Sequence, residues 1–469
     1  MSQSLKKHWP VILILVVSLV THFSFFGHPN ETVFDEVHFG KFISGYFTHE
    51  YFFDIHPPLG KLIISGAGYL TSFKPGFSFA NIGEKFPDNS YLWLRLLPTL
   101  AGVLLPIIIY LLALRLGLSR LASTTLSLLL ALENAFIVQS RFILLDSFLL
   151  LFGFSALLAY FRFRADKTRW RWFVITGVLA SLSISVKWTG LSFLGIIFII
   201  EALDLLKKPN IKSLGLILVS LITVPLILYC SIFVIHLELL TKTGPGDAFM
   251  TPQFRKTLIG SYDSTNPSVQ PLNMLQKIVE LNVEMYQSNA TLTATHPYSS
   301  KWYTWPFMQR PIYYWHGSDT RILQLGQNIA PKDSRIYFLG NPIIWFLSTI
   351  AILYLILDQL GSLYRKRKLD FLPGLIIGAY VVNMLPFVGI TRAMFLYHYM
   401  IGYIFALLAL IYLIDKIPNQ VSWIKSKTMV CAIVIIASIA SFLYFSPLTY
   451  GTPLTEKAYN FRAWLPSWK

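Results

Sequence analysis

Residues 33–61 read VFDEVHFGKFISGYFTHEYFFDIHPPLGK and follow directly on the first apolar run of the chain. This segment includes Asp35, Glu36, His38, Asp54 and His56, whose side chains are of types common in catalysis. Only 13% of the 469 residues are charged, so this density is unusual. Acidic groups beside a membrane segment are costly to place in lipid and are often functional. By composition alone, the alternative interpretation is a solvated loop whose charges have no function.

The composition indicates a membrane protein rather than a soluble one. Hydrophobic residues make up 54% of the chain and aromatic residues 15%, many of them near the ends of apolar runs. About eleven of these runs approach the roughly 20 residues that cross a bilayer as a helix. We expect spans at 9–26, 92–114, 121–139, 143–161, 171–187, 190–206, 213–236, 341–359, 372–389, 394–414 and 428–446.

The basic residues predict the orientation of these spans. The formal net charge is +16, but Lys and Arg cluster between apolar runs, which fits topology better than a nucleic-acid surface. If the N-terminus is cytoplasmic and the first run is an uncleaved signal anchor, all the basic loops fall on the cytoplasmic side. They contain Lys6–Lys7, Arg115–Arg120, Arg162–Arg171, Lys207–Lys212, Arg365–Lys368 and Lys416–Lys427.

This topology places two long loops, 27–91 and 237–340, on the outer face, together with the C-terminal tail. We therefore expect an N-terminal transmembrane module at 1–236, an extracytoplasmic loop at 237–340 and a C-terminal transmembrane module at 341–469. The 27–91 loop should hold helices lying along the membrane, because its apolar residues form one broad face before Pro57-Pro58 interrupts regular structure. The two cysteines, Cys230 and Cys431, lie in apolar runs and suggest neither a disulfide nor a metal site.

Three cations lie near the outer ends of predicted spans, namely Arg95, Arg141 and Lys187. Each one alone would be explained by snorkelling to the interface. Together, and beside the acidic pair Asp35-Glu36, they suggest a site for an anionic group.

The segment 282–315 is crowded with aromatic residues and prolines. It predicts either a soluble lid lined with rings, as sugar-binding sites often are, or an aromatic girdle at the membrane interface. His296 within it has two interpretations, a packed loop histidine or a substrate contact.

Several motifs resemble the protein O-mannosyltransferase family, whose members use a polyprenyl phosphate sugar. They are DEVHF at 35–39, FFDIHPPLGK at 52–61, KWTG at 187–190, HPYSSKW at 296–302, Trp305-Pro306, and FLYHY at 395–399. The resemblance runs through nearly the whole chain. It implies a GT-C glycosyltransferase fold of eleven spans, with the N-terminus cytoplasmic and the C-terminus outside. Eukaryotic members carry a β-trefoil (MIR) domain in the large outer loop. The corresponding loop of this sequence has about a hundred residues, which leave no room for that domain. The chain therefore resembles the shorter bacterial or archaeal members, and acceptor selection through that domain does not carry over.

The resemblance also implies an inverting transfer of mannose from a polyprenyl phosphate to Ser or Thr of exported proteins. Because the leaving phosphate is already a stable anion, one carboxylate base and several cations should suffice, unlike the two carboxylates of glycoside hydrolases. By likeness to the family, we expect Asp35 to be the base and Glu36 to support acceptor positioning or the neighbouring helix. Phosphate contacts are expected from Lys187, Arg95 and Arg141, and substrate contacts from His56, His296, Trp302 and Trp305.

No cofactor or metal is expected, although His38, Asp54 and His56 have suitable ligand chemistry, because their spacing matches no established metal motif. The partners would be the lipid donor, acceptor proteins and membrane lipid, at the cell membrane and without nucleic acid. The main alternative is a related GT-C enzyme with another lipid-linked sugar or a cell-envelope glycan acceptor. A transporter would predict internal repeats and ionisable groups near the bilayer midplane. A structural subunit would tolerate loss of Asp35.

Overall fold

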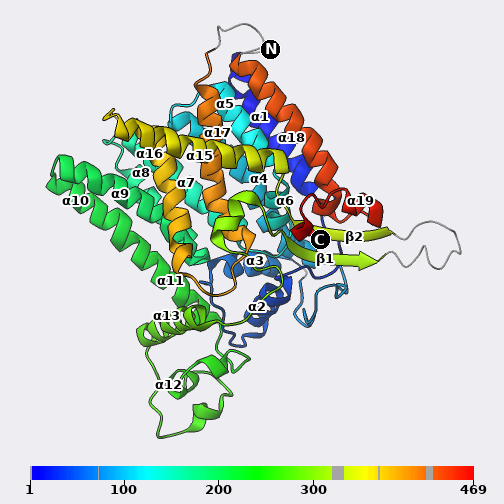
Figure 1. Ribbon diagram of the computed structural model, residues 1–469. Helices are drawn as coiled ribbons and strands as arrows, with labels where there is room; N and C mark the ends of the chain where they lie inside the picture. Colours follow the sequence, from blue (N-terminus) through cyan, green and yellow to red (C-terminus); the bar gives the residue numbers. More distant parts are fainter. Residues whose placement is uncertain (1–2, 72, 319–331, 368–369, 419–425) are drawn as a thin grey trace, which may run out of the picture. The chain divides into compact units, whose positions relative to one another are not determined.

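The computed structural model describes residues 3–71, 73–318, 332–367, 370–418 and 426–469, with side chains from residue 8 onward. Lys368 and Lys425, which belong to the predicted basic loops, lie outside the described residues. The chain is mainly helical, and each of the eleven predicted spans coincides with an apolar helix or helix pair (Figure 1).

Eight helices of the described chain are long and apolar enough to cross a membrane, or nine if one bent pair is a single span. Two further predicted spans coincide with shorter apolar helices, His8–Phe23 and Arg171–Val186. The predicted number of eleven crossings stays a prediction, as does the orientation.

The chain forms two compact units, each assembled from stretches distant in sequence. The first unit contains Met1–Pro29, Thr99–Arg141 and His296–Lys469, and the second contains Asn30–Pro98 and Phe142–Thr295. The sequence predicted three consecutive segments, 1–236, 237–340 and 341–469, which describe membrane topology and not compact units. This division therefore stays a prediction.

In the first unit, α15 and α16 pack against α17, while α1, α17 and α18 pack against α5. Its helices are α1 (Gln3–Phe23), α5 (Arg120–Ala131), α6 (Asn134–Ser140), α15 (Pro342–Tyr364), α16 (Phe371–Met384), α17 (Met400–Asp415), α18 (Lys427–Tyr450) and α19 (Glu456–Asn460). Helix α4 (Tyr91–Arg115) begins in the second unit and continues in the first.

The predicted span 121–139 is broken, because α5 and α6 meet at an angle of 59°. Glu133 lies at this break: it is the N-cap residue of α6, and its side chain accepts a hydrogen bond from Ala135 N. Its carboxylate also accepts bonds from Asn341 N (2.6 Å) and the Tyr403 hydroxyl (2.5 Å). A fully buried carboxylate is tolerated here because three donors satisfy it.

The helical prediction needs one addition, a small antiparallel sheet in the first unit with the order β1-β2-β3. The strands are β1 (Ile312–Ser318), β2 (Lys332–Phe338) and β3 (Leu454–Thr455). Ile312 pairs with Phe338, and a bulge follows Tyr313. Strand β1 lies in the aromatic-rich segment for which the sequence suggested a lid, and aromatic residues favour strands.

In the second unit, α8 packs against α7 and α11, and α2 packs against α3. Its helices are α2 (Glu36–Thr48), α3 (Leu59–Tyr69), α7 (Asp146–Ala165), α8 (Arg171–Val186), α9 (Leu191–Lys207), α10 (Ile211–Leu218), α11 (Val224–Leu239), α12 (Pro252–Arg255) and α13 (Met274–Thr291). Helices α2 and α3 form where interfacial helices were expected, but their position along a membrane stays a prediction.

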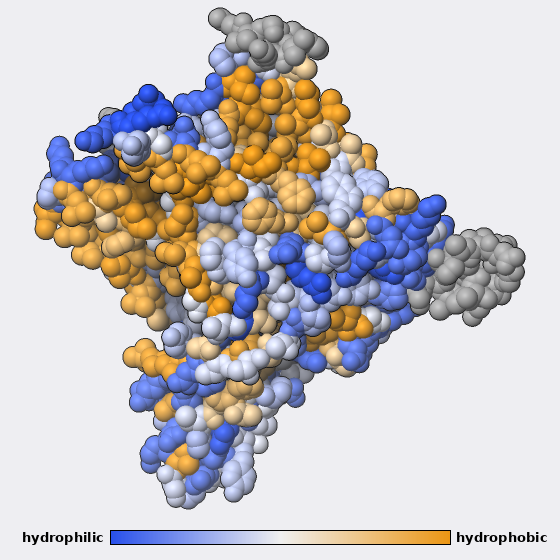
Figure 2. All heavy atoms as spheres, viewed as in Figure 1, coloured by the Kyte–Doolittle hydropathy of each residue, from blue (hydrophilic) through white to orange (hydrophobic). Residues whose placement is uncertain are grey.

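The surface of the second unit separates by hydropathy. Figure 2 shows hydrophobic side chains over α9, α10 and α11, and mainly hydrophilic ones over the region of α12. The large apolar side chains exposed on α9 to α11 include Leu203, Leu206, Leu218, Ile222, Leu226 and Ile227. Such a continuous apolar surface is typical of helices in contact with lipid.

Candidate active site

Asp35 lies at the N-cap position of α2, directly after a strained residue. Phe34 has a φ of 46°, a left-handed conformation that a bulky side chain rarely adopts. The Asp35 carboxylate does not cap α2, and it makes no hydrogen bond or ion pair within the described chain. It is partly exposed. The fold thus holds a carboxylate at a helix start without using it to stabilise that helix.

The neighbouring Glu36 has the opposite environment. Arg95 donates to it through Nη2 (2.6 Å) and Nε (2.8 Å), and both side chains are fully buried. The backbone N–H groups of Val33 and Ile143 donate to the same carboxylate at 2.9 Å. Glu36 therefore joins α2, α4 and the segment before α7. Its expected role in the reaction stays a prediction.

Arg95 is committed to this ion pair. Besides Glu36, its guanidinium donates to the Glu31 carbonyl (2.8 Å) and lies 4.8 Å from the Tyr91 ring centroid. The side chain is completely buried, so Arg95 contributes to the packing of this unit. Its predicted contact with a phosphate stays a prediction.

Lys187 and Asp146 form a second buried ion pair. Lys187 follows the last residue of α8, and Asp146 is the first residue of α7. The Lys187 ammonium lies 2.9 Å from both carboxylate oxygens of Asp146. Asp146 is not among the predicted site residues, because its ion pair with a residue 41 positions away cannot be inferred from spacing.

A third pair organises the HPP turn. The Lys61 ammonium donates to Asp54, and also to the carbonyls of His56 (2.8 Å) and Pro57 (3.2 Å). Lys61 lies in the first turn of α3, so it folds back over the turn that precedes its own helix. Lys61 was missing from the predicted site, although it ends the motif that suggested the family. His56 is held through its backbone, with a partly exposed side chain.

These residues form one electrostatic group, the carboxylate–lysine cluster, defined here as Asp35, Asp54, Lys61, Asp146 and Lys187. Burial raises the pKa of Asp35 to about 7, Lys187 opposes this rise, and Asp146 and Asp54 add to it. Burial also lowers the pKa of Lys61, while Asp54 counteracts that change. Asp54 and Asp146 each hold a lysine, which leaves Asp35 as the surplus carboxylate. Near pH 7 such a group can both take up and release a proton, as a general base must.

Arg141 belongs to the first unit. Its guanidinium donates to the Phe25 carbonyl and lies 4.6 Å from the Tyr450 ring centroid. The side chain is buried, so the structure gives Arg141 a packing role in its own unit. Its predicted contact with the donor phosphate stays a prediction.

The three aromatic candidates in the first unit differ in exposure. Trp305 is fully buried, and its indole N–H donates to the Ser300 hydroxyl (3.0 Å). Its predicted contact with a substrate stays a prediction. His296 and Trp302 are partly exposed and stay candidates for substrate binding.

Among the residues that the structure describes, no group of three or more His, Cys, Asp or Glu side chains is placed to hold a metal ion. Asp54, one of the possible ligands, is paired with Lys61 instead. The expectation of a reaction without a metal or cofactor stays a prediction.

Two stretches of the chain match described protein families. Residues 12–241 match "Dolichyl-phosphate-mannose-protein mannosyltransferase", and residues 274–468 match "C-terminal four TMM region of protein-O-mannosyltransferase". The chain belongs to the protein O-mannosyltransferase family. This membership agrees with the motif resemblance, and the first match contains the whole carboxylate–lysine cluster.

Similar proteins include Protein O-mannosyl-transferase 2 of Danio rerio, which is 35% identical over 278 residues. That alignment covers 55% of this chain and 37% of the relative. The chain thus matches about a third of the length of this curated protein O-mannosyltransferase.

Solved structures share the fold. The S. cerevisiae protein O-mannosyltransferase Pmt1-Pmt2 complex bound to the sugar donor matches with a TM-score of 0.88 at 22% identity, covering 100% of this chain and 93% of that one. ArnT from Cupriavidus metallidurans, bound to undecaprenyl phosphate, matches with a TM-score of 0.54 at 14% identity, covering 95% and 77%. The predicted GT-C fold is therefore confirmed.

Proposed function

We propose that this protein transfers mannose from a polyprenyl phosphate carrier to Ser or Thr hydroxyls of exported proteins, with inversion at the sugar. The family membership and the names of its relatives support the class of reaction. The observation that carries the proposal is Asp35, a partly exposed carboxylate left without a partner among the described residues while its acidic neighbours are paired.

In the proposed reaction, the acceptor hydroxyl gives its proton to the Asp35 carboxylate as its oxygen attacks the anomeric carbon. The bond from that carbon to the phosphate oxygen breaks, and the lipid phosphate leaves as an anion. The leaving group needs no proton, so one carboxylate is sufficient. A pKa near 7 keeps a large part of Asp35 ionised at neutral pH while leaving it basic enough to accept a proton.

Lys187 is the proposed contact for the departing phosphate. Its ammonium lies 2.9 Å from both carboxylate oxygens of Asp146. Asp146 would also hold the ammonium in place, so that the positive charge is already positioned when the phosphate becomes a free anion. Lys187 influences the pKa of Asp35, so the base and the cation belong to one cluster.

The proposal includes a multi-pass location in the cell membrane, a cytoplasmic N-terminus and a site on the outer face. It requires no cofactor. The distribution of basic residues between apolar runs supports this orientation.

The test is a transfer assay with the full chain in liposomes, a polyprenyl phosphate carrying labelled mannose, and a Ser/Thr-rich peptide. We expect label on the peptide, in the anomeric configuration opposite to that of the donor. The matched control is the same peptide with every Ser and Thr replaced by Ala. A glucose-bearing donor that reacts equally well, or a product with the donor's configuration, would contradict the proposal.

A further inference from the structure

Helix α13 in the second unit has three distinct faces along its 18 residues. The first face is buried and contains Ile278, Leu281 and Met285. It packs against Phe233 and Leu237 of α11 in one hydrophobic cluster. This face fixes α13 to the end of α11.

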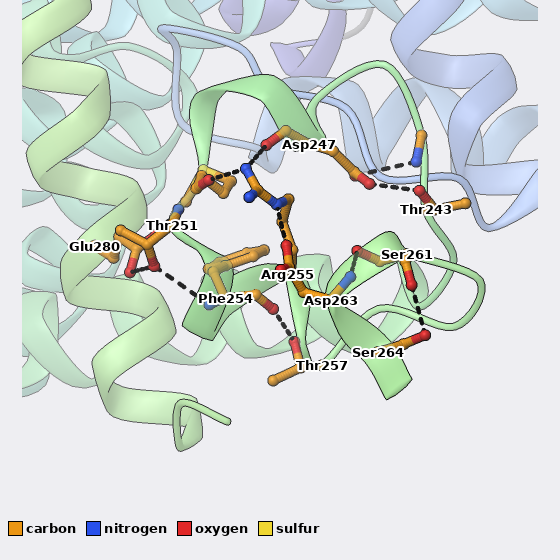
Figure 3. Close-up of polar contacts among 12 residues, drawn as sticks. Thr243, Asp247, Thr251, Phe254, Arg255, Thr257, Ser261, Asp263, Ser264 and Glu280 are labelled. Atoms are coloured by element: carbon orange, nitrogen blue, oxygen red, sulfur yellow. Dashed lines mark hydrogen bonds and ion pairs between the residues drawn. The ribbon is translucent and has the colours of Figure 1, made fainter. Parts of the chain in front are cut away.

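The second face is polar and holds the region around α12 (Figure 3). Glu280 accepts hydrogen bonds from the backbone N–H (2.8 Å) and the hydroxyl (2.9 Å) of Thr251, the N-cap residue of α12. Beyond it, Arg255 pairs with Asp263 at 2.7 Å. This region is rich in hydroxyls and charges, as expected of a segment in water.

The third face is apolar and exposed. Leu275, Val279, Val283 and Tyr286 are 65%, 54%, 48% and 66% exposed. Their spacing of four, four and three residues places them in one stripe. A helix that met only protein and water would not need a second apolar face, so this stripe requires an apolar environment.

The position of α13 along α11 indicates what that environment is. The apolar span Ile211–Leu239 has 29 residues, which corresponds to about 43 Å of helix, whereas the hydrocarbon core of a bilayer is about 30 Å thick. The span is therefore longer than the hydrocarbon is thick, which allows its C-terminal turns around Phe233 to lie in the interface. Helix α13 packs there, and Tyr229 of α11 donates a hydrogen bond to Asn282 of α13 at 2.6 Å.

The apolar surface continues from α11, where Ile227 and Ile235 are exposed. In Figure 1, α13 runs across the end of α11, with the α12 region on its far side. We propose that α13 is an interfacial helix whose stripe of Leu275, Val279, Val283 and Tyr286 lies in the lipid at the C-terminal end of α11. This geometry combines an apolar face toward acyl chains with a polar face toward water.

Helix α13 is also connected by hydrogen bonds to segments of the candidate active site. Asn289 donates to the Ile55 carbonyl at 3.2 Å, beside Asp54. The Tyr229 hydroxyl accepts a bond from the Trp188 indole at 2.9 Å, beside Lys187. Lipid contact by α13 therefore steadies two segments of the carboxylate–lysine cluster. The lipid contact itself does not depend on the proposed reaction.

The experiment measures the depth of spin labels on the full chain in nanodiscs of phosphatidylcholine and phosphatidylglycerol. In a background with Cys230→Ser and Cys431→Ala, single cysteines are introduced as Leu275→Cys and Val279→Cys and labelled with a nitroxide. The matched controls are Glu284→Cys, on the opposite face of α13, and Thr265→Cys, exposed in the α12 region. None of the readouts requires enzyme activity.

We expect the labels at 275 and 279 to collide several-fold more often with oxygen than with a water-soluble nickel chelate. The labels at 284 and 265 should show the reverse preference. Equal access of the chelate to all four labels would place the stripe in water and overturn the proposal. Protection of 275 and 279 from both reagents would also overturn it, because a protein partner would then cover the stripe.

Discussion

Two carboxylates at helix boundaries, Glu133 in the first unit and Asp35 in the second, show how the same chemical group serves two purposes. Glu133 is fully buried and accepts hydrogen bonds from Ala135, Asn341 and Tyr403. Asp35 is partly exposed, and its carboxylate has no such donor in the described chain. A carboxylate that accepts hydrogen bonds from the protein becomes part of the scaffold. A carboxylate without such donors is available for chemistry.

The contrast recurs between two consecutive residues. Glu36 binds Arg95 and two backbone N–H groups, whereas Asp35 binds none of them. Replacing either carboxylate by its amide is the same chemical change at adjacent positions. The two replacements should nevertheless produce different phenotypes.

The largest effect is expected from Asp35→Asn. Loss of the base should lower mannose transfer by about 10²–10⁴-fold. The melting temperature should stay the same or rise. The pKa of Asp35 is higher in the fold, at about 7, than its ordinary value of 3.8. The fold therefore loses stability as pH rises from about 4 to 7, and the amide removes that loss.

The comparison is made by transfer assay and thermal unfolding of the purified protein at pH 8. Asp88→Asn, an exposed residue of the same loop, is the matched control and should behave as the unmodified protein. Normal turnover of Asp35→Asn would refute its role as the base.

Glu36→Gln should instead reduce stability. The amide cannot neutralise Arg95, and removing one partner of a buried ion pair costs about 3–5 kcal/mol. We expect a clear fall in melting temperature relative to Asp35→Asn, measured under the same conditions. Equal melting temperatures for the two amide variants would contradict the structural role of Glu36.

Glu133→Ala should destabilise the first unit, because it leaves Asn341 N–H and the Tyr403 hydroxyl without an acceptor. Each buried donor left unpaired costs about 1–3 kcal/mol. Glu133→Gln retains one acceptor oxygen and should fall between the alanine variant and the unmodified protein. Thermal unfolding ranks the three proteins. Loss of transfer in a fully folded Glu133→Gln would show that this carboxylate does more than hold the break between α5 and α6.

The smallest expected effect is the pH dependence of transfer. A base with a pKa of about 7 must be ionised, so the rate should rise with pH and reach half its plateau near pH 7. Between pH 6 and pH 8 this amounts to about a tenfold change in the ionised fraction. Lys187, Asp146 and Asp54 are the charged groups that set this pKa. A rate that does not change between pH 5 and 8 would argue for another base.

Much of the fold followed from local patterns. Hydropathy located the apolar helices to within a few residues, because burial in lipid is a property of a single continuous segment. It missed β2, it missed β1, whose aromatic residues were interpreted as part of a lid or an interfacial girdle, and it missed the bend at Glu133. Both depend on contacts with distant residues, as the bond from Asn341 to Glu133 illustrates.

The sequence by itself determined the class of protein, its family motifs and the acidic pair at 35 and 36. Only the tertiary structure decided which of those charges is neutralised. Arg95 reaches Glu36 across 59 positions and Lys187 reaches Asp146 across 41. An ion pair is set by distance in space, which no local spacing records, so Asp35 could be recognised as the surplus carboxylate only after its neighbours had been paired.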